Sequence, residues 1–405
     1  MPKTIARSPV GPIMRAVMAL SSALSSSVVA EARPTRRDHR IDIARGLALA
    51  MLFVDHMPRN NLNLLTLHSF SFCDAAEIFV LLAGASSALA YGKVLRSDLL
   101  AGLRRIGSRC LRIYVTHILL IVSTLLIGIS YAADKPDLLP SMAQMVALGH
   151  RAPWLIATLQ AMPALLDILP LYIVLLAAFP LIERAMRVNM GATLAGSFAL
   201  WGVAYLVPAL DLPNATDSHG WYFNPFSWQL LFVLGAALPG LLAASPEQCL
   251  PRRAWLVWLC VAFLVFGVIQ SIPYADWNWP SLRPLDMPTP DKSRLAPLRV
   301  VAILAMVYLV FSDSRTRIGL SNPLAAWLAR LGRNSLEVFA AACLLGMAGH
   351  AAFLQLGAGL GMQIMVNTVG FVALTGVALV FERGRQQSRN ARATHAYTQG
   401  QVVLD

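Results

Sequence analysis

The sequence predicts an all-α polytopic membrane protein, a bundle of about ten transmembrane helices with both termini in the cytoplasm. Three observations predict this fold class. Of the 405 residues, 57% are apolar and 13% are charged, whereas a soluble domain has about 25% charged residues. The apolar residues fall in blocks of about 17 to 22, the length that crosses a bilayer. Lysine and arginine gather in every second connection between these blocks, and the positive-inside rule places those connections in the cytoplasm.

The chain divides into a leader, a membrane domain and a tail. Residues 1–38 are polar and rich in arginine and serine, so they are expected to be a disordered cytoplasmic leader. The transmembrane domain is expected to cover 39–384, and a cytoplasmic tail 385–405. Within the domain, the apolar blocks predict spans at 41–58, 75–93, 111–131, 166–184, 191–209, 226–244, 254–272, 297–312, 335–354 and 361–382.

Charge and cysteine content exclude several functions. The net charge of +12 does not indicate nucleic-acid binding, because the cations lie between apolar blocks and not on one continuous face; topology explains them. The five cysteines show neither a CxxC pair nor a spacing with histidine that is typical of a metal site. We therefore expect membrane lipid as a partner, and we expect no nucleic acid, no metal and no bound cofactor.

The first predicted span carries ionisable groups at both ends. Arg45 lies toward its expected cytoplasmic end, and Asp55 and His56 lie at its expected outer end. Such groups are costly inside a membrane unless they are paired or hydrated, so they indicate function. Histidine titrates near neutral pH and can accept a hydroxyl proton during acyl transfer. Glu77, at the outer end of the second predicted span, is expected to be the partner of His56, whereas a helix-end cap is the alternative for a histidine alone.

Two arginines are candidates for binding an anion. Arg45 is expected to meet a phosphate or carboxylate that enters from the cytoplasm, because a guanidinium binds such groups through two parallel hydrogen bonds. An ion pair with Asp42, three residues earlier, is the alternative, and both can hold. Arg299 opens an apolar run and is expected to line a cavity, since a lipid-facing arginine would have to snorkel. Two roles are expected for Arg299: it binds a substrate carboxylate, or it forms an ion pair with Asp291 or Glu77 and does not meet the substrate.

Aromatic residues gather in two loops on the expected outer side. Rings beside carboxylates suit the apolar faces and hydroxyl groups of sugars, while an interfacial aromatic belt produces the same composition. The two groups are Trp221, Tyr222, Phe223, Phe226 and Trp228, and then Tyr274, Trp277 and Trp279. On the expected cytoplasmic side, Arg333, Asn334 and Glu337 open the ninth predicted span with more polar groups than lipid contact requires.

Six segments, in their order along the chain, resemble the OpgC family, which is part of the wider acyltransferase-3 type of transmembrane acyltransferases. The resemblance covers about residues 38 to 382. Arg45, ten further residues and His56 also match the Arg/Lys-X10-His pattern of the wider type. The six segments are Ile41–Gly46 with its continuation to His56, Asp74–Val80 followed by Gly84, Leu169–Ile173, Phe223–Gln229, Asp291–Arg299 and Leu331–Phe339.

The resemblance implies a multi-pass bacterial inner-membrane enzyme that transfers a succinyl group from cytoplasmic succinyl-CoA, an acyl-CoA co-substrate, to osmoregulated periplasmic glucans. It implies that His56 is the catalytic base or acyl-handling residue, that Glu77 is its companion and that Arg45 belongs to the donor path. Ala83-Gly84-Ala85 replaces a Ser-Gly-Tyr sequence frequent in the family. Substrate-binding roles are expected for Asp42, Arg45, Asp55, Asp74, Trp221, Asn224, Trp228, Lys292, Arg299, Arg333, Asn334 and Glu337.

Other functions stay open at this stage. The enzyme interpretation also admits an acetyl donor or another glycan acceptor of the cell envelope, and either direct transfer or an acyl-enzyme intermediate. A transporter or flippase for an anionic glycan would also use arginine and histidine within the membrane. A structural subunit of a glucan-synthesis complex is a third possibility. In a His56→Ala variant, lost acylation with normal periplasmic glucan levels would favour the enzyme, whereas reduced glucan export would favour the transporter.

Overall fold

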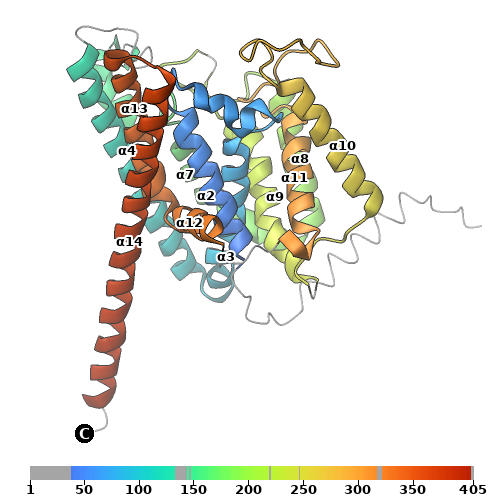
Figure 1. Cartoon of the computed structure of the whole chain (residues 1–405). Helices are drawn as coiled ribbons and strands as arrows, with labels where there is room; N and C mark the ends of the chain where they lie inside the picture. The colour runs from blue at the N-terminus through green and yellow to red at the C-terminus, as the bar shows by residue number, and fades with distance from the viewer. Residues whose placement is uncertain are drawn as a thin grey trace, which may run out of the picture.

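The computed structural model describes residues 38–132, 144–145, 147–218, 220–245, 247–316 and 322–402, and these residues form helices joined by loops without a strand. The prediction of an all-α bundle is confirmed for them (Figure 1). Every predicted span overlaps a helix. These helices are α2 (His39–Asp55), α3 (Ala75–Ser97), α4 (Leu99–Ala132), α7 (Ile168–Val188), α8 (Met190–Leu206), α9 (Pro225–Ala243), α10 (Ala254–Ser271), α11 (Pro297–Phe311), α13 (Ser335–Leu356) and α14 (Leu360–Val402).

Seven helices in the described part of the chain are long and apolar enough to cross a membrane. They are α3, α4, α7, α9, α10, α13 and α14, whereas α8 and α11 are apolar but shorter. α2 has 17 residues and carries the charged groups singled out above. Membrane insertion follows from these helices, because in lipid a helix satisfies its own backbone hydrogen bonds. A count of ten spans with cytoplasmic termini stays a prediction.

Two helices extend more than ten residues beyond their predicted spans. α4 begins at Leu99, ahead of the predicted start at 111, and α14 continues to Val402, beyond the predicted end at 382. Arginine, glutamine and alanine are good helix formers, so a helix continues through them although they do not suit the hydrocarbon core. The expected tail is thus helical as far as Val402, and it projects from the bundle (Figure 1). The expected leader lies outside the described residues, apart from Asp38.

Short helices complete the described fold. α12 (Pro323–Arg333) is capped by Asn322, whose side chain accepts hydrogen bonds from the Leu324 and Ala325 amides. The spans predicted from apolar blocks did not include it, because its apolar residues alternate with arginine and are too few to cross a bilayer. The remaining short helices are η2 (Asn61–Leu65), η3 (Leu67–Ser69), η5 (Gly149–Arg151), α6 (Ala152–Ala157) and η6 (Ser314–Thr316).

Glycines fix the two helices that carry most of the predicted site residues. A Cβ atom at Gly46 of α2 would clash with the backbone carbonyl of Leu328 in α12. A Cβ at Gly84 of α3 would clash in the same way with the carbonyl of Phe232 in α9. Gly332 and Gly235 occupy the matching positions on the partner helices. Small residues of this kind let membrane helices approach backbone to backbone.

We expect Gly84→Ala to destabilise the bundle. The added methyl group meets backbone and not a flexible side chain, so α3 and α9 must separate, and overpacking of this kind costs about 1–3 kcal/mol. Gly196→Ala on α8 is the matched control, because a Cβ there meets nothing within 4 Å. Thermal unfolding of the two detergent-solubilised variants tests the expectation. Equal melting temperatures would contradict the close α3–α9 contact.

Candidate active site

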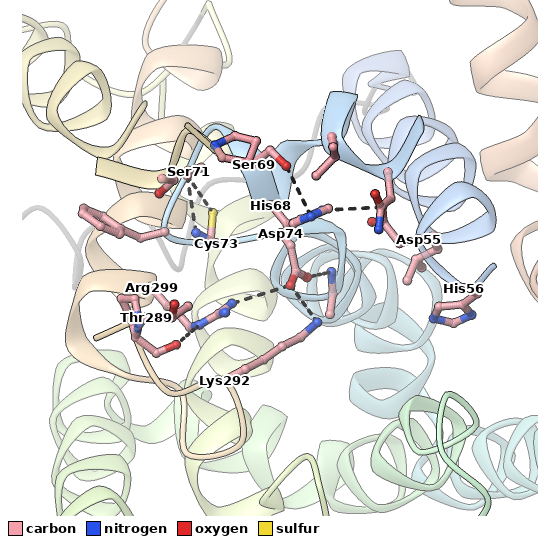
Figure 2. A pocket seen from close by; sticks show the side chains of 18 of the residues that line it. Asp55, His56, His68, Ser69, Ser71, Cys73, Asp74, Thr289, Lys292 and Arg299 are labelled. Atoms are coloured by element: carbon pink, nitrogen blue, oxygen red, sulfur yellow. Dashed lines mark hydrogen bonds and ion pairs between the residues drawn. The ribbon is translucent and has the colours of Figure 1, made fainter. Parts of the chain in front are cut away.

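A cavity of about 760 Å³ lies where α2 ends and α3 begins. The loop between α10 and α11, residues 272–296, closes over the same end of the bundle, while α14 ends on the opposite side (Figure 1). Residues from segments far apart in the sequence therefore share one wall. Five of the predicted site residues line this cavity: Asp55, His56, Asp74, Lys292 and Arg299 (Figure 2).

The end of α2 places His56 at the cavity wall. His56 is the C-cap of the helix, and its amide donates to the Leu52 carbonyl. Its ring packs against α13: Nδ1 lies 4.0 Å from the Cys343 sulfur, and the ring centroid lies 6.3 Å from that of Phe339 in an edge-to-face arrangement. Gly346 allows this approach, since a Cβ there would come within 3.2 Å of the His56 carbonyl oxygen. The imidazole is thus held by α13 on one side and faces the cavity on the other.

Asp55 has its own partners. Thr66 Oγ1 donates to Asp55 Oδ1 over 2.6 Å, and His68 Nδ1 lies 3.6 Å from the same oxygen. Adjacent residues on a helix point about 100° apart, so Asp55 contacts the loop after α2 whereas His56 contacts α13. His68 was not among the predicted site residues. In the sequence, His68 can be recognised only as a polar residue in the loop after the first span. Its spacing from Asp55 does not predict that the two side chains meet.

Two carboxylates and two cations form a cluster at the start of α3, and three of them, Asp74, Lys292 and Arg299, line the cavity. The Asp74 side chain caps α3, and Glu77 Oε2 accepts the Asp74 amide in a capping box. Glu77 Oε1 lies 2.6 Å from Arg299 Nη1, and Asp74 Oδ2 lies 2.6 Å from Lys292 Nζ and 3.6 Å from Arg299 Nη1. Figure 2 shows Lys292 and Arg299 converging on Asp74. The ion pair between Arg299 and Glu77, an alternative left open by the sequence, is therefore present.

This cluster determines where Glu77 points. Its carboxylate is fully buried, and the contacts that the structure gives it are with Arg299 and the Asp74 amide. Glu77 lies behind the cavity wall and reaches the cavity through its partners. A direct role beside His56 stays a prediction, whereas a role in holding Arg299 is visible in the geometry.

Lys292 is the more accessible cation of the cluster. Its side chain is 26% exposed, against 9% for Arg299. Burial alone would lower the pKa of Lys292, but the carboxylates of Asp74 and Glu77 raise it above its usual value. The ammonium lies 5.7 Å from the centre of the Phe223 ring. Lys292 therefore places a positive charge at the cavity surface.

The aromatic loop supports the cavity and contributes part of its lining. Trp228 is fully buried and donates from Nε1 to the Lys292 and Ser293 carbonyls over 3.2 and 3.0 Å. Asn224 caps α9 and donates to the Leu210 carbonyl over 2.7 Å. Trp221 is buried as well. These three predicted residues lie outside the cavity lining, and Tyr222 and Phe223 of the same loop line it.

A second cavity, of about 410 Å³, lies toward the opposite end of α2 and is lined by Asp42 and Arg45. The Arg45 guanidinium donates to Ser86 Oγ over 3.1 Å and to Ser335 Oγ over 2.6 Å. These contacts join α2 to α3 and α13. The remaining predicted residues lie where α12 ends and α13 begins, outside both cavity linings: Arg333 pairs with Glu382, Asn334 with Arg330 and Arg385, and Glu337 with Arg112.

Several polar residues line the larger cavity that the sequence did not single out. Asp167 is buried and directly precedes α7, next to a segment that resembles the family. It was not predicted because no charged residue lies near it in the sequence. Gln270 of α10 donates to the Leu285 carbonyl over 2.7 Å and so holds the loop that closes the cavity. The described residues contain no cluster of histidine, cysteine, aspartate and glutamate arranged to hold a metal ion. Other polar residues of the lining that the sequence analysis did not single out include His68, Ser69, Ser71, Cys73 and Arg283.

The sequence matches a known protein family over most of its length. The family profile described as "OpgC protein" matches residues 37–386. The chain belongs to the OpgC family. The match spans both cavities and the helices from α2 to α13, together with most of α14. Neither the curated proteins nor the solved structures give a match. Membership in the OpgC family implies a glucan-modifying, acyltransferase-like role.

Proposed function

We propose that this OpgC-family protein is an inner-membrane O-acyltransferase that moves a succinyl group from cytoplasmic succinyl-CoA to hydroxyl groups of a periplasmic glucan. One observation carries the proposal: α2 connects two cavities, with Arg45 in one and His56 in the other. Arg45 and His56 are eleven positions apart along this helix, a rise of about 16 Å. This is about half of a hydrocarbon core, a span that an extended thioester arm can cross.

The smaller cavity suits the donor. Arg45 presents a guanidinium that can bind a phosphate or carboxylate through parallel hydrogen bonds. Ser86 and Ser335 hold it from two other helices, so its orientation is fixed before the donor enters. In the proposed complex, the nucleotide part of the acyl-CoA stays on the cytoplasmic side and the pantetheine arm enters the bundle.

The larger cavity suits acyl transfer. His56 faces it from the end of α2, and Tyr222 and Phe223 line it with aromatic surface. Aromatic rings beside polar groups are suited to sugars, which present apolar faces and hydroxyls. In the proposed reaction, His56 contacts the acyl group and the glucan hydroxyl enters through the periplasmic end of the cavity.

The charge cluster supports succinyl over acetyl as the acyl group. A succinyl group ends in a free carboxylate, which is costly to bury without a cation. Lys292 has three donors and one close carboxylate partner, Asp74, so its remaining donors can bind the succinyl carboxylate. Arg299 is held by Glu77 in a nearly buried pair. We therefore propose Lys292 as the cation that meets the acyl end and Arg299 as its support.

Mass spectrometry of periplasmic glucans from a host strain that lacks this gene tests the proposal. We expect the glucans to lose mass increments of succinyl groups while their amount stays normal, and the intact gene to restore the increments. If the glucans lose acetyl increments instead, the donor is an acetyl thioester and not succinyl-CoA. Reduced export of unmodified glucan would favour a transporter, and loss of glucan synthesis would favour a subunit of the synthesis complex.

A further inference from the structure

A second histidine lines the cavity that contains His56, and it has a carboxylate of its own. His68 belongs to η3, and its side chain is 39% exposed. Thr66 Oγ1 lies 2.8 Å from His68 Nδ1 and 2.6 Å from Asp55 Oδ1. Figure 2 shows the His68 ring between Asp55 on one side and Ser69 on the other. A histidine, a hydroxyl and a carboxylate are thus connected in series at the cavity wall.

The order of the hydrogen bonds follows from the charges. A carboxylate can only accept, so the Thr66 proton points to Asp55 Oδ1 and the Thr66 oxygen accepts from His68 Nδ1–H. Thr66 Oγ1 also lies 2.8 Å from the Asn63 carbonyl, but a hydrogen bond to a charged acceptor is the stronger one. The proton on Nδ1 leaves Nε2 with a free lone pair. Nε2 lies 3.3 Å from Ser69 Oγ, a long contact that another hydroxyl can readily replace.

The two histidines occupy different depths. His56 is half-buried, at the end of a helix, with α13 behind it. His68 lies in the loop between α2 and α3 and is exposed to the cavity. A large acceptor that enters between the loops meets His68 first, whereas an acyl chain that comes through the bundle from the second cavity meets His56 first.

We propose that His68, held through Thr66 by Asp55, is the base that takes the proton from the acceptor hydroxyl. This inference rests on the proposed function and deepens it. In the step, the acceptor O–H bond breaks and its proton moves to His68 Nε2. The acceptor oxygen forms a bond to the carbonyl carbon held at His56, the carbon–sulfur bond of the thioester breaks, and the thiolate leaves with the electron pair. The imidazolium then returns its proton to water, and the thiolate takes one.

A comparison of two acceptors tests the proposal in the detergent-solubilised full chain with succinyl-CoA. A glucan hydroxyl needs a base, whereas hydroxylamine attacks an acyl carbon at neutral pH without one. We expect His68→Ala and His68→Gln to lower the rate of transfer to an oligoglucan by about 10²-fold or more and to leave transfer to hydroxylamine near the wild-type rate. Added imidazole should partly restore glucan transfer in His68→Ala. Thr66→Val should show a smaller loss of the same kind.

Control variants distinguish a base role of His68 from a nucleophile role of Ser69 and from a structural role of His68. Ser69→Ala tests the neighbouring hydroxyl: loss of transfer to both acceptors would make Ser69 the nucleophile, and the proposal would then be wrong. Unchanged glucan transfer in the two His68 variants, or an equal loss with both acceptors, would also overturn it. Wild-type protein that transfers succinyl to neither acceptor would overturn the proposed function, and the role of His68 with it.

Discussion

His56→Ala is expected to abolish acyl transfer while the fold and donor binding are kept. Removal of a histidine that acts on the reacting group costs about 10²–10⁴-fold in rate, and here it should affect glucan and hydroxylamine alike, because both accept the acyl group at His56. The ring packs against Cys343 and Phe339 at the end of α2, so its removal opens space at the cavity wall and leaves the helix crossings unchanged.

The matched control is His150→Ala. His150 is exposed on η5 and does not line the cavity, so its loss should leave the rate unchanged. The succinylated product is measured by mass spectrometry, and binding of succinyl-CoA by calorimetry. A His56→Ala protein that retains the wild-type rate would exclude His56 from the chemistry. A protein that no longer binds succinyl-CoA would instead assign His56 to the donor site.

Arg299→Gln is expected to have the largest effect on stability. It leaves Glu77 buried with no cation at 2.6 Å, and removal of one partner of a buried ion pair costs about 3–5 kcal/mol. The melting temperature should therefore fall, and transfer from succinyl and acetyl donors should fall together. The double variant Glu77→Gln/Arg299→Gln should recover much of the lost stability, because it removes the unpaired charge.

Lys292→Gln is the variant with which the stability and donor selectivity of Arg299→Gln are compared. Lys292 is more exposed than Arg299, so its loss should change the melting temperature little and lower succinyl transfer more than acetyl transfer. An Arg299→Gln protein of normal stability that selectively loses succinyl transfer would reverse the two assignments. Arg299 would then bind the acyl carboxylate and Lys292 would be its support.

The helices could be predicted from the sequence because membrane insertion is a local requirement. A span must be about 20 apolar residues long and must satisfy its own hydrogen bonds, so each predicted block overlaps a helix. The Asp74–Glu77 capping box is equally local, since Asp74 is the N-cap of α3 and Glu77 lies in its first turn. The ends of α4 and α14 were less predictable, because helix propensity continues where hydrophobicity stops.

The candidate site depends on contacts that no local rule contains. The pairing of Glu77 with Arg299 joins residues 222 positions apart, and the choice between Arg299 and His56 as the partner of Glu77 rests on how α3 and α11 are placed. Trp228 was predicted to bind sugar because it is an aromatic residue near an outer loop, yet its indole N–H donates to the Lys292 carbonyl and holds that loop. His68 joins Asp55 because the chain turns back after α2. The helices and the polar residues at their ends follow from local patterns in the sequence. Which of those residues meet follows only from the tertiary structure, since side-chain partners depend on packing between helices and not on their order in the chain.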